Sequence, residues 1–128
     1  MTIEGWINSN DFTSEQHFIG KNGNGNDKGW NSELYDANDI MLQSGEGSQY
    51  MDMSTGDSLA SDNTWYHVAI IWDTDTNDAT FYINGIAQSN NGGHDDLRDW
   101  DATTNDTFIG LSKATGEDRY PYLSLIHI

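Results

Sequence analysis

The sequence predicts an all-β fold, an antiparallel two-sheet sandwich of the jelly-roll kind. Runs of alternating, β-branched and aromatic residues recur along the chain, between clusters of Gly, Asn and Asp that are typical of turns. No segment has the periodicity of an amphipathic helix. Glycine occurs 13 times and proline once, which favours many short antiparallel strands over a parallel α/β fold.

The first half of the chain contains five strand-like runs. In the first, over residues 3–8, Ile3, Gly5 and Ile7 share one face, while Glu4 and Trp6 share the other. The other runs cover residues 17–21, 30–35, 39–43 and 49–53. Residues 21–29 are predicted to form a loop, because Gly and Asn tolerate positive φ.

The second half contains the clearest strand, over residues 65–73. Apolar side chains occupy both of its faces, which predicts a central strand covered on both sides. Residues 73–78 have turn chemistry, residues 79–83 return as a strand, and Asn84-Gly85 predicts a two-residue type I′ hairpin turn. Residues 86–89 lead away from that turn. A polar loop over 89–104 and a strand over 107–111 follow.

The composition limits the partners of this chain. Its 128 residues suit one domain, and its 5 Trp, 6 Tyr and 4 Phe indicate a folded core. With 21 Asp and Glu against 5 Lys and Arg, the surface repels nucleic acid and anionic lipid; it suits divalent cations, or serves solubility alone. The absence of cysteine excludes disulfides, thiolate zinc sites and cysteine nucleophiles. No apolar run is long enough to span a membrane.

Several segments, in order, resemble the laminin-G-like branch of the concanavalin A-like superfamily. The more specific pair reads WYHVA at residues 65–69 and FYING at residues 81–85; weaker matches read TIEGWI at 2–7, FIGK at 18–21 and FIG at 108–110. The resemblance implies two antiparallel sheets and binding at rim loops. It also implies recognition of a glycan or an extracellular protein, sometimes with a structural calcium, within a secreted or cell-surface protein.

Two departures from the family pattern concern the ends of the chain. Family members usually begin with one more strand, and they close with a strand in which acidic and basic residues alternate, which residues 123–128 lack. We therefore expect a partial domain over residues 1–122, truncated at both ends, and a tail over 123–128 that is either foreign or mis-assembled.

An acidic loop is the candidate calcium site. Asp95, Asp96, Asp99 and Asp101 lie close together in the sequence, and Ca²⁺ prefers six to eight oxygen ligands. The alternative is a solvated acidic loop in which Arg98 relieves repulsion. Residues 73–78 begin like an EF-hand loop, but Asp78 and Asn84 stand where Gly and a bidentate Glu are needed, so we interpret them as a hairpin turn.

A glycan site needs an exposed aromatic side chain with hydrogen-bonding groups beside it. Trp30 and Trp100 adjoin loops, where binding residues concentrate, and Asn31 lies beside Trp30. Trp30 could equally be the first core residue of its strand, and Trp100 could cap a sheet edge. The other tryptophans lie within strand runs and are assigned to the core, namely Trp6, Trp65 and Trp72.

Catalysis is not expected. The E-x-D-x-x-E strand motif of glycoside hydrolases with this fold is absent, and the four histidines have no metal-ligand spacing. The sequence therefore favours a non-catalytic recognition module that binds a glycan or an extracellular protein. A structural spacer with no ligand of its own is the alternative from a different class, and a glycoside hydrolase is the least favoured.

Overall fold

The computed structural model of the protein confirms the all-β sandwich. It describes residues 1–12, 16–22, 28–35, 38–46, 49–56, 59, 61–73, 75–76, 78–90, 107–109 and 123–126. The strands are β1 (Thr2–Ser9), β2 (Gln16–Asn22), β3 (Lys28–Tyr35), β4 (Asp39–Glu46), β5 (Gln49–Ser54), β6 (Tyr66–Asp73), β7 (Asp78–Ile83), β8 (Ile86–Ala87), β9 (Phe108–Ile109) and β10 (Leu123–Ile126).

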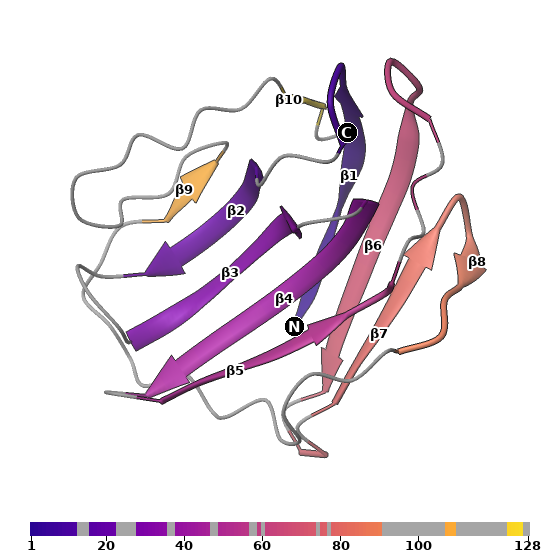
Figure 1. The fold of residues 1–128 in the computed structure, drawn as a ribbon. Coiled ribbons are helices and arrows are strands. Elements are labelled where there is room, and N and C mark those ends of the chain that lie inside the picture. The colour runs from indigo at the N-terminus through magenta and orange to yellow at the C-terminus, as the bar shows by residue number, and fades with distance from the viewer. Residues whose placement is uncertain are drawn as a thin grey trace.

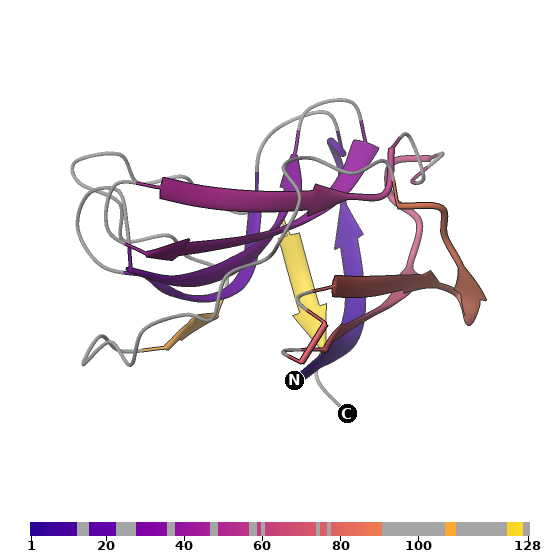
Figure 2. The ribbon, with the colours of Figure 1, turned by 90° about the horizontal axis from the view of Figure 1, so that it is seen from below.

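The strands form two five-stranded sheets (Figure 1). Sheet A has the order β10-β1-β6-β7-β8, and sheet B has the order β5-β4-β3-β2-β9. Every pairing is antiparallel. Figure 2 shows the sheets as two layers, and in such layers only the facing sides bury a common core.

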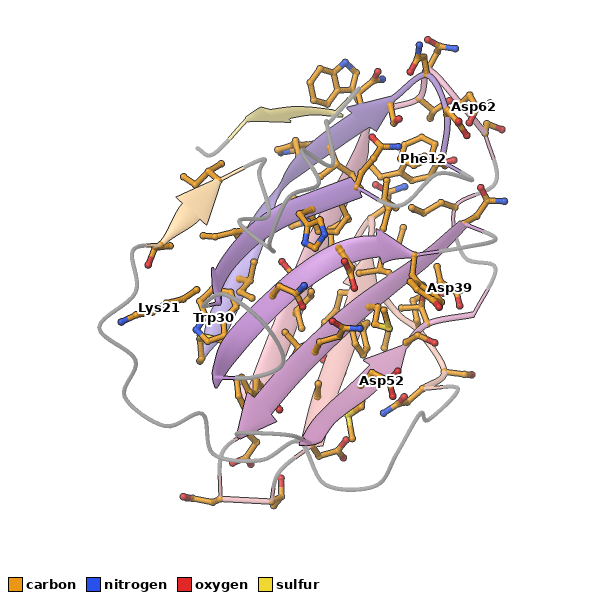
Figure 3. The ribbon with its side chains drawn as sticks, turned by 60° about the vertical axis from the view of Figure 1, so that its left-hand side comes forward. Phe12, Lys21, Trp30, Asp39, Asp52 and Asp62 are labelled. Atoms are coloured by element: carbon orange, nitrogen blue, oxygen red, sulfur yellow. The ribbon has the colours of Figure 1, made fainter. Side chains whose placement is uncertain are left out.

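The core lies between the sheets and consists of apolar side chains from both. Sheet A contributes Ile7, Tyr66, Val68, Ile70, Trp72, Ala79, Phe81 and Ile83; sheet B contributes Phe18, Trp30, Leu34, Ile40, Leu42 and Met53. Phe12 and Leu59 complete this cluster from outside the strands. The backbone N–H of Phe12 donates to Asp62 Oδ1 at 2.9 Å, and the two residues lie at the same end of the sandwich (Figure 3).

The hairpins form as the sequence predicts. Asp73 pairs with Asp78 across the β6–β7 turn, so the EF-hand-like segment is a hairpin turn. Asn84 and Gly85 have φ values of 52° and 78° between the paired residues Ile83 and Ile86. Positive φ at both central residues is the requirement of a type I′ turn.

The prediction that β6 is covered on both sides is wrong. Tyr66, Val68, Ile70 and Trp72 are buried, but the alternate residues of β6 are half-buried or exposed, and Ile71 is exposed. A strand that is apolar on both faces can pack one face only when its sheet has a single partner sheet. Sheet A therefore presents an outer surface with apolar groups on it.

The segment at residues 123–126 is part of sheet A, although the sequence analysis placed it outside the domain. Strand β10 pairs with β1 through Trp6–Ile126, Ile7–Leu125, Asn8–Ser124 and Ser9–Leu123. The described part of the chain contains no helix long and apolar enough to cross a membrane.

Candidate functional site

The outer surface of sheet A gathers two exposed tryptophans and a hydrogen-bonding pair. Trp6 is 38% exposed and Trp65 is 43% exposed. Because side chains alternate along a strand, Trp6 shares its side of β1 with Glu4. Trp65 immediately precedes β6, two residues before His67. Trp6 is directly opposite His67 in the β1–β6 pairing. We call these four residues, Glu4, Trp6, Trp65 and His67, the aromatic face.

Cross-strand contacts fix the geometry of the aromatic face. The Trp6 and His67 ring centroids are 5.2 Å apart with the ring planes at 61°, an edge-to-face arrangement. His67 Nε2 lies 3.0 Å from Glu4 Oε1, and this contact holds the imidazole toward β1. The His67 backbone N–H donates to Asn84 Oδ1 at 2.9 Å, which ties the same residue to the β7–β8 turn.

The aromatic face is open to solvent, and three of its four residues lie on paired strands. The Glu4 side chain is 62% exposed, which leaves room for a ligand to reach its carboxylate. Strands β1 and β6 each have a hydrogen-bonded neighbour on both sides. The face therefore combines a flat apolar ring with hydrogen-bonding groups on a preorganised sheet, which is the chemistry that the sequence analysis required of a glycan site.

The sequence does not predict this site, because the strand-like runs assign Trp6 and Trp65 to the core. That assignment is wrong for both residues, and correct for Trp72, which is fully buried. For Trp6 the sequence contains a signal of exposure. Trp6 shares one face of β1 with Glu4, while the apolar Ile3 and Ile7 lie on the other face of the same strand. For Trp65 no such signal existed, since both faces of β6 are apolar.

The outer surface of sheet B carries a different group, a buried polar cluster of His17, Asn31 and Glu33. Its members lie on β2 and β3, where His17 pairs with Glu33. Asn31 Nδ2 lies 3.2 Å from His17 Nδ1, and His17 Nε2 lies 3.1 Å from Glu33 Oε2. If the Asn31 amide donates to Nδ1, a neutral His17 carries its proton on Nε2, toward Glu33.

Burial sets the protonation of the polar cluster. It raises the pKa of Glu33 to about 8, and the charge of Asp52 adds to that rise. Burial also lowers the pKa of His17 to about 4. Both groups are therefore neutral near pH 7, since a charge enclosed in this cluster would be poorly solvated. Glu33 is 1% exposed, so a substrate atom has no access to its carboxyl group in this structure.

The predicted ligand residues Trp30 and Asn31 are buried instead of exposed. Trp30 is 7% exposed and belongs to the core, which is the alternative that its strand position allowed. The expectation of an exposed aromatic plate at Trp30 therefore does not hold, because its side chain points between the sheets. Lys21 pairs with Trp30 across β2 and β3, and the two lie together at one end of the sheet (Figure 3). Asn31 faces the other way and contributes to the polar cluster.

Trp30 also borders an apolar cavity of about 300 Å³ between the sheets. Its walls include Phe18 and Ile19 from sheet B and Val68 and Ile70 from sheet A. Among the described residues that line it, only Thr2 and Glu4 have polar side chains for a sugar to contact, apart from the Trp30 indole N–H. The cavity is therefore a weaker candidate for glycan binding than the aromatic face.

The other predicted site residues, Trp100 and the aspartates Asp95, Asp96, Asp99 and Asp101, lie outside the described residues. Within the described ranges, no three His, Asp or Glu side chains converge to hold a metal ion. The calcium site at residues 95–101 stays a prediction.

Comparison with known proteins supports the same fold. The family model described as the concanavalin A-like lectin/glucanases superfamily (Laminin_G_3) matches residues 1–125. No curated protein sequence matches the chain. Among solved structures, the CBM40 domain of the Ruminococcus gnavus IT-sialidase bound to α2,3-sialyllactose is similar, with a TM-score of 0.73 and 12% identity over 97% of this chain and 73% of that one.

Two further structures have the same fold. The R. gnavus domain bound to α2,6-sialyllactose has a TM-score of 0.68 and 12% identity, over 94% of this chain and 69% of that one. The leech intramolecular trans-sialidase has a TM-score of 0.72 and 15% identity over 94% of this chain, which spans 19% of that enzyme. The match of the family model to residues 1–125 shows that the chain belongs to the Laminin_G_3 family of the concanavalin A-like lectin/glucanases superfamily.

Proposed function

We propose that this chain is a non-catalytic glycan-binding module that binds its ligand on the aromatic face of sheet A. The observation that carries the proposal is the exposed indole of Trp6 beside the Glu4–His67 pair. A pyranose ring has an apolar C–H side that packs on an indole, and hydroxyl groups at its edge that need donors and acceptors. Glu4 and His67 provide these groups beside the ring.

The fold and the polar cluster also favour binding over catalysis. Similar structures include CBM40 domains bound to sialyllactose, so a sandwich of this shape suits sugar recognition. Glycoside hydrolysis needs two carboxyl groups that reach the same glycosidic bond. Glu33 has the raised pKa of a catalytic acid, but its carboxyl group is buried against His17. We place the module in a secreted or cell-surface protein, as the family resemblance implies.

Replacement of Trp6 tests the proposal. We expect Trp6→Ala to weaken retention of the protein in gels that contain soluble polysaccharides by at least about tenfold, equivalent to ~1.4 kcal/mol. The thermal midpoint should change little, because a side chain that is 38% exposed contributes less to the core than a buried one. Tyr35→Ala is the matched control, since Tyr35 is a 44% exposed aromatic residue on sheet B.

The outcomes separate the alternatives. Equal retention of Trp6→Ala and the wild type would place any glycan site elsewhere on the molecule. If the wild type is retained by no glycan, the structural spacer becomes the better interpretation. If the wild type instead cleaves a glycan that it binds into fragments with new reducing ends, the chain is a hydrolase.

A further inference from the structure

We infer that the aromatic face selects neutral glycans and rejects glycans that end in sialic acid, the sugar that the similar CBM40 domains bind. This inference rests on the proposed function and adds the class of ligand to it. It starts from the charges on sheet A. None of its five strands contains a lysine or an arginine.

The charged side chains of sheet A are mainly acidic. Glu4 lies within the aromatic face, and Asp73 and Asp78 pair with each other at the far end of the same surface, where both are exposed. The α-amino group of Met1 donates to the carbonyl of Trp72 at 2.6 Å. Met1 lies five residues before Trp6 on an extended strand, which places its backbone about 16 Å away. Within the part of the chain that the structure describes, the only basic side chain at the face is therefore His67, and its Nε2 already contacts Glu4.

Among the described residues of this surface, a sialic acid carboxylate would find no lysine or arginine. Proteins bind carboxylates with arginine, lysine or unpaired backbone N–H groups. At the centre of the face the backbone is occupied: Trp6 lies between paired residues of β10 and β6, and the His67 N–H donates to Asn84 Oδ1. A bound carboxylate would also approach the exposed Glu4 carboxylate, and two like charges repel.

A neutral sugar needs no cationic partner and is not repelled by the Glu4 carboxylate. Its C–H side packs on Trp6, and its hydroxyl groups donate to the Glu4 oxygen that His67 does not contact. Ala69 is opposite Glu4 in the strand pairing and has only a methyl side chain. Trp65, at the start of β6, offers a second exposed ring. These features suit a neutral sugar that lies flat on the sheet.

The test compares neutral glycans with acidic ones. Lactose and N-acetyllactosamine are titrated beside their α2,3- and α2,6-sialylated derivatives, and xylan, mannan and β-glucan are compared with polygalacturonate and alginate in affinity gels. We expect binding to neutral members, and at least about tenfold weaker binding to acidic ones at low salt, with the gap narrowing at ~1 M salt as charges are screened. Equal or tighter binding of the acidic members overturns the inference but leaves the proposed function intact. Binding of no glycan at all overturns both.

Glu4→Gln identifies the residue responsible. The amide keeps the size of the side chain and can still contact His67, but it removes the negative charge. We expect it to reduce the discrimination between neutral and sialylated glycans by at least half. Asp75→Asn removes one charge from the exposed β6–β7 turn, away from the aromatic face, and serves as the matched control. An equal change in both variants would mean that the net charge of the chain, and not Glu4, sets the discrimination.

Discussion

The two sheets differ in which side chains on their outer sides are exposed to solvent and which are buried. On sheet A, aromatic rings that could fill a core are exposed at Trp6 and Trp65. On sheet B, polar groups that would suit a binding site are buried, namely His17, Asn31 and Glu33. Hydrophobic residues are usually inside and carboxylates outside, so each surface departs from the usual pattern. The comparison teaches that exposure, more than residue type, decides which surface is available to a ligand.

The largest effect we expect separates a buried tryptophan from an exposed one. Trp72→Ala removes a fully buried indole from the core and should destabilise the protein by about 3–5 kcal/mol. Trp65→Ala removes an exposed indole only seven positions earlier and should cost less than about 1 kcal/mol. Urea unfolding followed by circular dichroism measures both. Similar losses in the two variants would mean that the aromatic face is packed as tightly as the core.

The next effect concerns the close approach of two strands beneath the polar cluster. Gly20 is opposite Asn31, and a Cβ atom on Gly20 would lie 2.9 Å from the Asn31 Cβ. Gly20→Ala should therefore push β2 away from β3 and destabilise the protein by about 1–3 kcal/mol. The same urea unfolding measures this loss, with Thr80→Ala on the exposed side of β7 as the control. An unchanged midpoint for Gly20→Ala would show that this region of sheet B can relax.

The smallest effect is a pH dependence that arises from the polar cluster. Glu33 keeps its proton to about pH 8 in the folded protein but loses it near its ordinary pKa of 4.5 when unfolded, so its contribution lowers stability as pH rises through this window. The pKa of His17 is lowered from 6.5 to about 4, so its contribution raises the free energy of unfolding as pH rises between those two values. The contributions of Glu33 and His17 to stability therefore cancel up to about pH 6.5.

Between about pH 6.5 and 8 only the Glu33 contribution remains, and we expect the free energy of unfolding to fall by about 1–2 kcal/mol. Glu33→Gln cannot ionise and should show a smaller fall over the same interval. Denaturant titrations at pH 5, 6.5 and 8 give the comparison. An equal fall in the variant and the wild type would assign the effect to the general charge repulsion of the acidic chain.

The fold was predictable because its determinants are local. Alternation within β1 and the Asn84-Gly85 turn predicted strands and a hairpin that the structure contains. The aromatic face was not predicted, because the sequence analysis ranked tryptophans by their neighbours in the chain. A long apolar strand such as β6 does not reveal which of its faces meets the partner sheet, and that choice depends on the arrangement of both sheets.

The polar cluster was harder still to predict. His17 and Glu33 meet only through the β2–β3 pairing, whose register shifts between His17 and Ile19. A one-residue change in register moves a side chain to the opposite face of a sheet. The sequence alone therefore cannot place Glu33 beside His17.

The turn residue Asn84 closes the β7–β8 hairpin and also contacts β6. Asn84 adopts a left-handed conformation, and it both donates its backbone N–H to the His67 carbonyl at 2.8 Å and accepts the His67 N–H with its side chain at 2.9 Å. The tip of one hairpin therefore anchors the end of β6 that carries His67. A residue outside the aromatic face thus fixes the backbone from which the His67 imidazole projects.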